Sequence, residues 1–160
     1  MRGSSIVAAG LALAVMGGAA GRAAEEEAGQ TPPIPGDWRA MPGGQGLTAL
    51  VERSSLERRG NLVVGWQALV GGPRKDKTVF PVFRLVIDCK AHTLSFIRHE
   101  VVKIPDGTVT LDTAPKMTRA KITSGPGLVI MRGACESASM DGWAAYKDPR
   151  DFALTTLPKE

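Results

Sequence analysis

Two cysteines, Cys89 and Cys135, constrain this chain more than any other feature, because its first two dozen residues are typical of an export signal. An exported chain enters an oxidising compartment, where two thiols without metal-ligand neighbours normally form one structural disulfide. Such a bond closes a loop of about 47 residues, which the chain-entropy relation associates with a stabilisation of about 4 kcal/mol. The cysteines therefore predict a small domain held by one covalent cross-link.

The first 23 residues are predicted to be a signal peptide. Arg2 supplies a positive charge, and residues 6–20 form an uninterrupted run of apolar and small residues that leads to cleavage after Ala20 or Ala23. The run is short and rich in Ala and Gly, so an uncleaved transmembrane anchor is not expected. We expect the mature chain in the periplasm or at the cell surface, without a membrane anchor.

The charge distribution argues against nucleic acid as a partner. The formal charge of +4 falls to +2 once Arg2 and Arg22 leave with the signal peptide. Basic and acidic residues alternate, and aromatic residues make up 5% of the chain. Neither a sustained basic block nor basic residues interleaved with stacking rings is present, and nucleic-acid binding requires one or the other. The sequence does not determine the oligomeric state.

Residues 24–46 are predicted to be a flexible leader, because Glu, Gly, Pro and Gln supply too little apolar area to offset the entropy of ordering. Within it, only Trp38 is expected to be anchored, at the edge of the core. Strand-like segments follow at 47–52, 62–70, 79–88, 94–102 and, with a weaker pattern, 108–111. Phe83, Leu85 and Ile87 are expected on one face of the sheet, as are Leu94, Phe96 and Val102.

A helix is predicted to begin at Pro126, since proline is well suited to the first helical position. Leu128, Met131 and Cys135 would then share one face, which would bring Cys135 to Cys89. Two glycines in this segment leave a bare strand as an alternative. The predicted fold class is α+β: a small antiparallel sheet of about four to six strands, packed against one helix in the C-terminal half, with one disulfide.

Several short motifs occur in a characteristic order. They are Leu50 to Leu56, Arg59-Gly60-Asn61, Trp66 inside a strand, Ile87-Asp88-Cys89-Lys90 and the late Cys135. In this combination the chain resembles the surface-adhesin protein E family of bacterial exported proteins, over about residues 38–135. The family-like domain is placed at 47–137. In two places the chain departs from the family pattern: Leu50 stands where an aromatic residue is common, and Glu52 replaces the usual Asp.

The resemblance implies a small antiparallel sheet on one helix, with a disulfide between the cysteines. It also implies structural roles for the matched motif positions, which are Trp38, Glu52, Ser55, Gly60, Asn61, Trp66 and Asp88. The best-described member of the family binds host matrix and plasma proteins, but adhesion surfaces lie in variable loops, so no binding residue is carried over. The segment 103–123 has no counterpart in the family pattern.

Catalytic and metal sites find little support in the sequence. His92 and His99 are the only histidines, and a zinc site would need both with Glu100 or Asp88, without any HExxH or CxxC pattern. A turn histidine and a solvent-facing strand histidine are the commoner explanation. Ser54 and Ser55 are expected to shape a turn rather than to act as nucleophiles. No catalytic, metal-binding or cofactor-binding residue is assigned, and no cofactor is expected.

Residues 138–160 are predicted to be an extension that packs on the domain, because their apolar content exceeds that of a disordered tail. Trp143 and Tyr146 are expected to cover the open face of the sheet; the alternative is an exposed contact patch with Lys147 and Arg150.

The favoured function is a non-catalytic interaction domain that contacts a protein partner through the loops 71–77 and 103–118. An accessory envelope protein without a host target is the alternative, and a metal-binding or hydrolytic enzyme is the third hypothesis.

Overall fold

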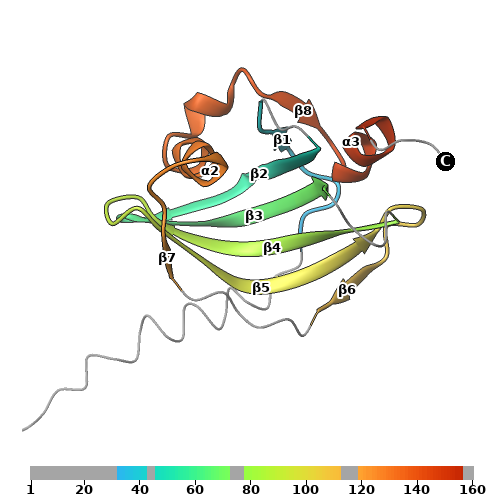
Figure 1. Cartoon of the computed structure of the whole chain (residues 1–160), viewed down its shortest axis with the longest axis horizontal. Helices are drawn as coiled ribbons and strands as arrows, with labels where there is room; N and C mark the ends of the chain where they lie inside the picture. The colour runs from blue at the N-terminus through green and yellow to red at the C-terminus, as the bar shows by residue number, and fades with distance from the viewer. Residues whose placement is uncertain (1–31, 43–45, 73–77, 113–118, 157–160) are drawn as a thin grey trace, which may run out of the picture.

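The computed structural model describes residues 32–42, 46–72, 78–112 and 119–156. The predicted signal peptide, residues 24–31 and 43–45 of the expected leader, residues 73–77 and 113–118 of the two loops, and residues 157–160 lie outside this part. Within the described residues, eight strands form one antiparallel sheet in the order β6-β5-β4-β3-β2-β1-β8, and β7 pairs with β5 (Figure 1). The strands are β1 (Trp38–Ala40), β2 (Leu47–Arg59), β3 (Leu62–Gly71), β4 (Val79–Asp88), β5 (Thr93–Lys103), β6 (Val109–Leu111), β7 (Ala120–Lys121) and β8 (Ala144–Tyr146). The helices are α2 (Pro126–Cys135), the 3-10 turn η1 (Ser137–Met140) and α3 (Pro149–Thr156).

The predicted α+β class with an antiparallel sheet is confirmed, but its details are wrong. In the part of the chain that the structure describes, the sheet has eight strands where about four to six were expected, and two α-helices accompany it where one was expected. The four long strands β2 to β5 correspond to the predicted ones and form a meander. Gly60 makes the turn between β2 and β3 with a φ of 62°, a conformation that costs glycine little.

The additional elements are short: β1, β8 and α3 lie in segments expected to be leader or extension, and β7 lies in the segment 103–123. β1 belongs to the range 24–46, and its Trp38 pairs with Glu52 of β2 on one side and Tyr146 of β8 on the other. β8 and α3 belong to the range 138–160. A three-residue strand is too short to show an alternation of apolar and polar residues in the sequence. Its conformation depends on pairing with the longer strand beside it.

The two faces of the sheet have separate cores, as alternation along β3 shows. Trp66, Ala68 and Val70 lie in one cluster and Val63 in another, so they point to opposite faces. We call these the Trp66 face and the α2 face. On the Trp66 face, the buried residues are Trp38, Ala40, Leu50, Trp66, Ala68, Val70, Phe80, Val82, Val102 and Ile104, with Ala153 of α3. On the α2 face, Met131 and Ala134 pack on Val63, Leu85, Ile87 and Leu94, and Ile130 packs near Ala49 and Val51.

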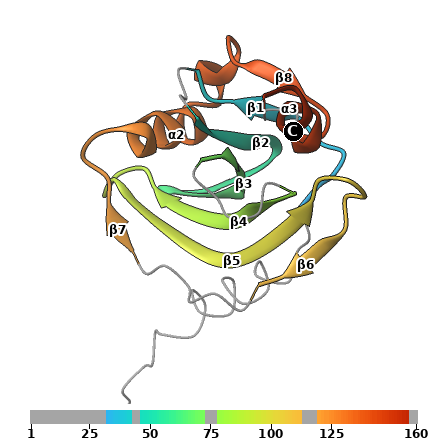
Figure 2. The ribbon, with the colours of Figure 1, turned by 45° about the vertical axis from the view of Figure 1, so that its right-hand side comes forward.

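A bulge reverses the expected facing of the second half of β5. Arg84 pairs with Arg98 whereas Leu85 pairs with Phe96, which leaves an extra residue in β5. Leu94 and Phe96 therefore pack on the α2 face as predicted, but Val102 lies in the core of the Trp66 face. The prediction that all three share a face is wrong because a single inserted residue shifts the alternation by one. Figure 2 shows how β5, β4 and β3 follow one another across the curved sheet.

Candidate interaction surface at the disulfide end

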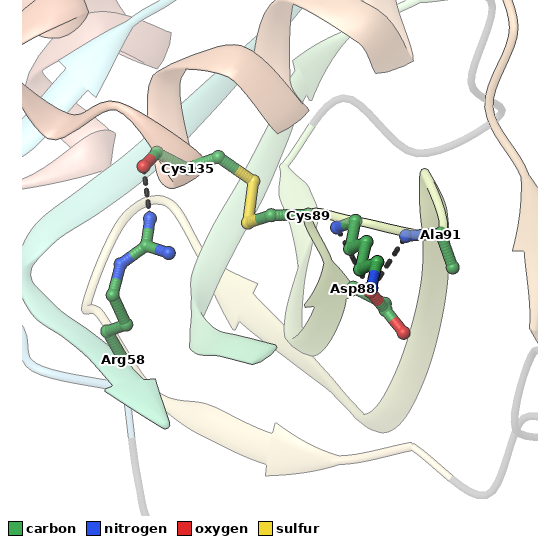
Figure 3. Close-up of a disulfide and its surroundings, with 6 residues drawn as sticks. Arg58, Asp88, Cys89, Ala91 and Cys135 are labelled. Carbon is green, nitrogen blue, oxygen red and sulfur yellow. Dashed lines mark hydrogen bonds between the residues drawn. A yellow bond between two sulfur atoms is a disulfide. The ribbon is translucent and has the colours of Figure 1, made fainter. Parts of the chain in front are cut away.

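A disulfide between Cys89 and Cys135 joins the end of α2 to the residue after β4, with a Cα–Cα distance of 5.9 Å (Figure 3). The predicted pairing of the two cysteines is confirmed. The helix begins at Pro126 as expected and keeps Met131 and Ala134 buried against the sheet. Because 46 positions separate the cysteines, the bond links elements that are distant in sequence.

Two hydrogen bonds add a third segment to this junction. The Arg58 guanidinium donates to the carbonyl of Cys135 (Figure 3). The Cys89 N–H donates to the Asn61 carbonyl at 2.9 Å. The β2–β3 turn with Gly60, the β4–β5 turn and the last turn of α2 are thereby held together. We call the surface formed by these three segments and β7 the disulfide end.

Asp88 organises the β4–β5 turn. One carboxylate oxygen accepts from the N–H groups of Lys90 (3.1 Å) and Ala91 (2.9 Å), and the other accepts from Arg119 Nη2 at 3.1 Å. The backbone hydrogen bond from Ala91 is the largest cause of a lowered pKa for this carboxyl, with Lys90 and Arg119 acting in the same direction. His92 completes the turn with a φ of 54°. Asp88 therefore serves as a turn former.

Basic side chains dominate the disulfide end. Its exposed basic residues are Arg58, Arg59, Lys90, Arg119, Lys121 and Arg132. Its acidic residues are Glu57, Asp88 and Glu136, of which Glu57 pairs with Arg59 and Asp88 with Arg119. Cross-strand pairing puts Arg59, Leu62, Asp88, Thr93 and Lys121 in one row across the end of the sheet. Leu62, at 40% exposure, is the apolar residue of this row and stands between Arg59 and Asp88.

The remaining motif positions lie in the interior, where Trp38, Glu52 and Trp66 are cross-strand neighbours on the Trp66 face. The fully buried Glu52 carboxylate accepts hydrogen bonds from Asp37 N (2.7 Å), Ser54 Oγ (2.6 Å), Ser54 N (3.3 Å) and Ser55 N (2.6 Å). Ser55 Oγ donates back to the Glu52 carbonyl at 3.0 Å. These contacts hold the irregular part of β2 between Glu52 and Glu57. Glu52 and Ser55 thus shape a strand bulge.

The sequence analysis did not identify Arg84 and Arg98, which continue the cross-strand row formed by Trp38, Glu52 and Trp66. Arg84 is 1% exposed with its guanidinium 5.5 Å from the centre of the Trp66 ring, and Arg98 Nε donates to the buried Glu100 at 2.6 Å. Arg84 occupies the same phase of β4 as Phe80 and Val82, so alternation could have identified it as inward-facing. Arginine is seldom buried, and it was therefore not considered for the core.

The two histidines lie in different surroundings. His99 stacks on Phe83 with ring centres 4.6 Å apart, and its Nδ1 lies 3.2 Å from Asp112 Oδ2. Glu100 follows His99 directly in the strand and therefore points to the opposite face, while His92 is exposed in a turn. Within the described residues, no group of three or more His, Cys, Asp and Glu side chains is placed to bind a metal ion.

Trp143 and Tyr146 do not form a joint patch with Lys147 and Arg150. Trp143 packs beside Met140 on the α2 face, whereas Tyr146 meets Phe152 edge-on at 5.3 Å on the Trp66 face. Arg150 binds Asp148 and lies over Gly107 in the β5–β6 turn. The aromatic residues of the extension therefore cover the two cores.

The chain matches no protein-family profile, no curated protein and no solved structure. Among the helices of the described residues, none is long and apolar enough to span a bilayer.

Proposed function

We propose that this protein is an exported, non-catalytic interaction domain that binds a protein partner, as its resemblance to the surface-adhesin protein E family implies. The observation that carries the proposal is the Cys89–Cys135 disulfide, because such a bond persists in the periplasm or outside the cell and is rare in the cytosol. The predicted signal peptide points to the same compartment.

The use of the polar side chains also supports an interaction role. Glu52 and Asp88, the two motif carboxylates, accept backbone hydrogen bonds within bulges and turns. His99 stacks on an aromatic ring and contacts a carboxylate. Each of these groups is engaged in supporting the sheet. The surface that remains for a partner consists of turns and strand ends held by the disulfide and its neighbouring hydrogen bonds.

The test is a binding assay with the purified mature protein in its oxidised form. Immobilised host matrix and plasma proteins are compared with immobilised proteins of the bacterial envelope, and the reduced and alkylated protein serves as a control for the folded surface. The proposal predicts saturable binding to at least one protein by the oxidised form. Binding to envelope proteins alone would favour the accessory-envelope alternative, and binding that survives unfolding would contradict both.

The enzyme alternative has its own measurement. Metal analysis of the purified mature protein is expected to find no zinc at stoichiometric amounts. Stoichiometric zinc that is lost in His92→Ala would establish the metal-binding hypothesis instead.

A further inference from the structure

Among the described residues, the two ends of the sheet differ in charge. At the disulfide end, six exposed basic residues face three acidic ones, two of which are already paired. Among the described residues of the opposite end, Arg150 lies among Asp106, Asp148 and Asp151, with Lys103 as a second basic residue. The sequence between β3 and β4 adds Arg74, Lys75 and Lys77 against Asp76, outside the described residues. β5 runs from Thr93 at one end to Lys103 at the other, 11 residues that span about 33 Å along an extended strand. This length exceeds the screening length of about 8 Å at physiological salt, so a charged surface would interact with each end independently.

We propose that the disulfide end docks on an anionic phospholipid bilayer, with Leu62 entering the interface and the surrounding Lys and Arg side chains contacting lipid phosphates. This role is additional to the binding of a protein partner, and either can exist without the other.

An apolar residue among basic residues favours a bilayer over other anionic partners. Leu62 is 40% exposed at the tip of the β2–β3 hairpin, next to Arg59 in the cross-strand row. Interfacial segments combine apolar groups that enter the acyl boundary with Lys and Arg whose long stems carry the charge to the headgroups. A polyanionic sugar chain would use the positive charge but would gain nothing from the leucine.

The structure also holds this surface in place before any contact. The disulfide and the Arg58 hydrogen bond fix α2 against the hairpin, and the Cys89 N–H joins the two turns through Asn61. Docking therefore requires little further ordering of the backbone, which lowers the entropic cost of a weak surface contact. Each Lys or Arg near an anionic membrane is expected to raise the binding affinity about fivefold.

The experiment is sedimentation of the oxidised mature protein with vesicles made of equal parts phosphatidylglycerol and phosphatidylcholine, and with vesicles of phosphatidylcholine alone. We expect binding to the anionic vesicles only, with loss of binding as salt is raised. Lys121→Gln is expected to weaken binding about fivefold, and the double variant Lys90→Gln/Lys121→Gln about 25-fold. Lys103→Gln, which removes the same charge from the opposite end of β5, is the matched control and is expected to leave binding unchanged.

A second pair of variants tests the apolar contact. Leu62→Gln is expected to weaken binding severalfold at constant charge, whereas Leu111→Gln, at a residue 63% exposed on β6, is expected to have no effect. Unchanged circular dichroism confirms that each variant is folded. Equal effects of Lys121→Gln and Lys103→Gln, or no binding to anionic vesicles, would overturn the proposal. So would binding to heparin through the same lysines without vesicle binding.

Discussion

At the scale of single residues, the side chains of greatest interest are carboxylates that accept several hydrogen bonds. Glu52 is completely buried. Where the bulge in β2 interrupts the pairing with β3, its carboxylate accepts the backbone hydrogen bonds that a neighbouring strand would otherwise accept. A buried carboxylate is stable in such a place only when donors surround it. Sequence motifs identified Glu52 and Ser55 as structural, but they could not show that the donors come from residues as far apart as Asp37 and Ser55.

Replacement of Glu52 should therefore be costly. Glu52→Ala leaves several buried N–H groups without an acceptor, and we expect the free energy of unfolding to fall by about 2 to 4 kcal/mol. Glu57→Ala removes the same charge from a side chain that is 45% exposed and should change stability by less than about 0.5 kcal/mol. Urea unfolding of both variants provides the measurement. Equal losses would show that the Glu52 contacts contribute nothing specific.

Asp88 gives a prediction about pH. Its pKa is lowered in the folded protein, so its ionised form stabilises the native state above the unfolded pKa of about 3.9, and this contribution is lost as pH falls through the folded pKa. Asp88→Asn should therefore be less stable than the wild type at neutral pH. The difference should shrink as the pH falls below about 4. Urea unfolding across this range measures it, and a difference that stays constant in acid would contradict the assignment.

At the scale of elements, predictability follows length. Strands β2 to β5 and helix α2 each contain enough residues to show their period and their boundaries, and they were predicted. β1 and β8 have three residues each, and their strand conformation depends on pairing with each other and with β2. The bulge in β5 leaves no signal in the residue composition, so Val102 was predicted on the wrong face of the sheet. Arg84 was missed because its burial depends on the Trp66 ring beside it.

The packing of α2 provides a test at this scale. A Cβ added at Gly133 would lie 2.8 Å from Trp143 Cη2 and 3.1 Å from Met140 Cγ. Overpacking of this kind typically costs 1–3 kcal/mol, against a gain of about 1 kcal/mol in helix propensity. We expect Gly133→Ala to lower the free energy of unfolding by about 1 kcal/mol, as measured by chemical denaturation. Leucine is smaller than tryptophan, so Trp143→Leu should relieve the clash that Gly133→Ala creates. The free energy of unfolding of the double variant should therefore fall by less than the sum of the two single losses. If Gly133→Ala raised the free energy of unfolding, α2 would not lie this close to Met140 and Trp143.

At the scale of the whole molecule, one disulfide joins α2 to the sheet and gathers three segments into a single charged end. The sequence predicted this bond because the export signal implies an oxidising compartment for the two cysteines. The basic character of the disulfide end was not predictable, since it depends on which turns the strand pairing brings together.

A mutant cycle tests the mutual bond. Cys89→Ser and Cys135→Ser should lower the free energy of unfolding by similar amounts, up to about 4 kcal/mol. The double variant should be no less stable than either single variant, because one bond is lost in all three. Thermal or urea unfolding of the oxidised proteins gives the comparison. Additive losses would show that the two thiols are not bonded to each other.

The most direct test of the account is an intact-mass measurement on protein harvested under native oxidising conditions and alkylated with and without prior reduction. The account predicts the mass of a chain cleaved after Ala20 or Ala23, with no alkyl group before reduction and two after it. Two alkyl groups on the unreduced protein would contradict the disulfide, and with it the placement of this domain outside the cytoplasm.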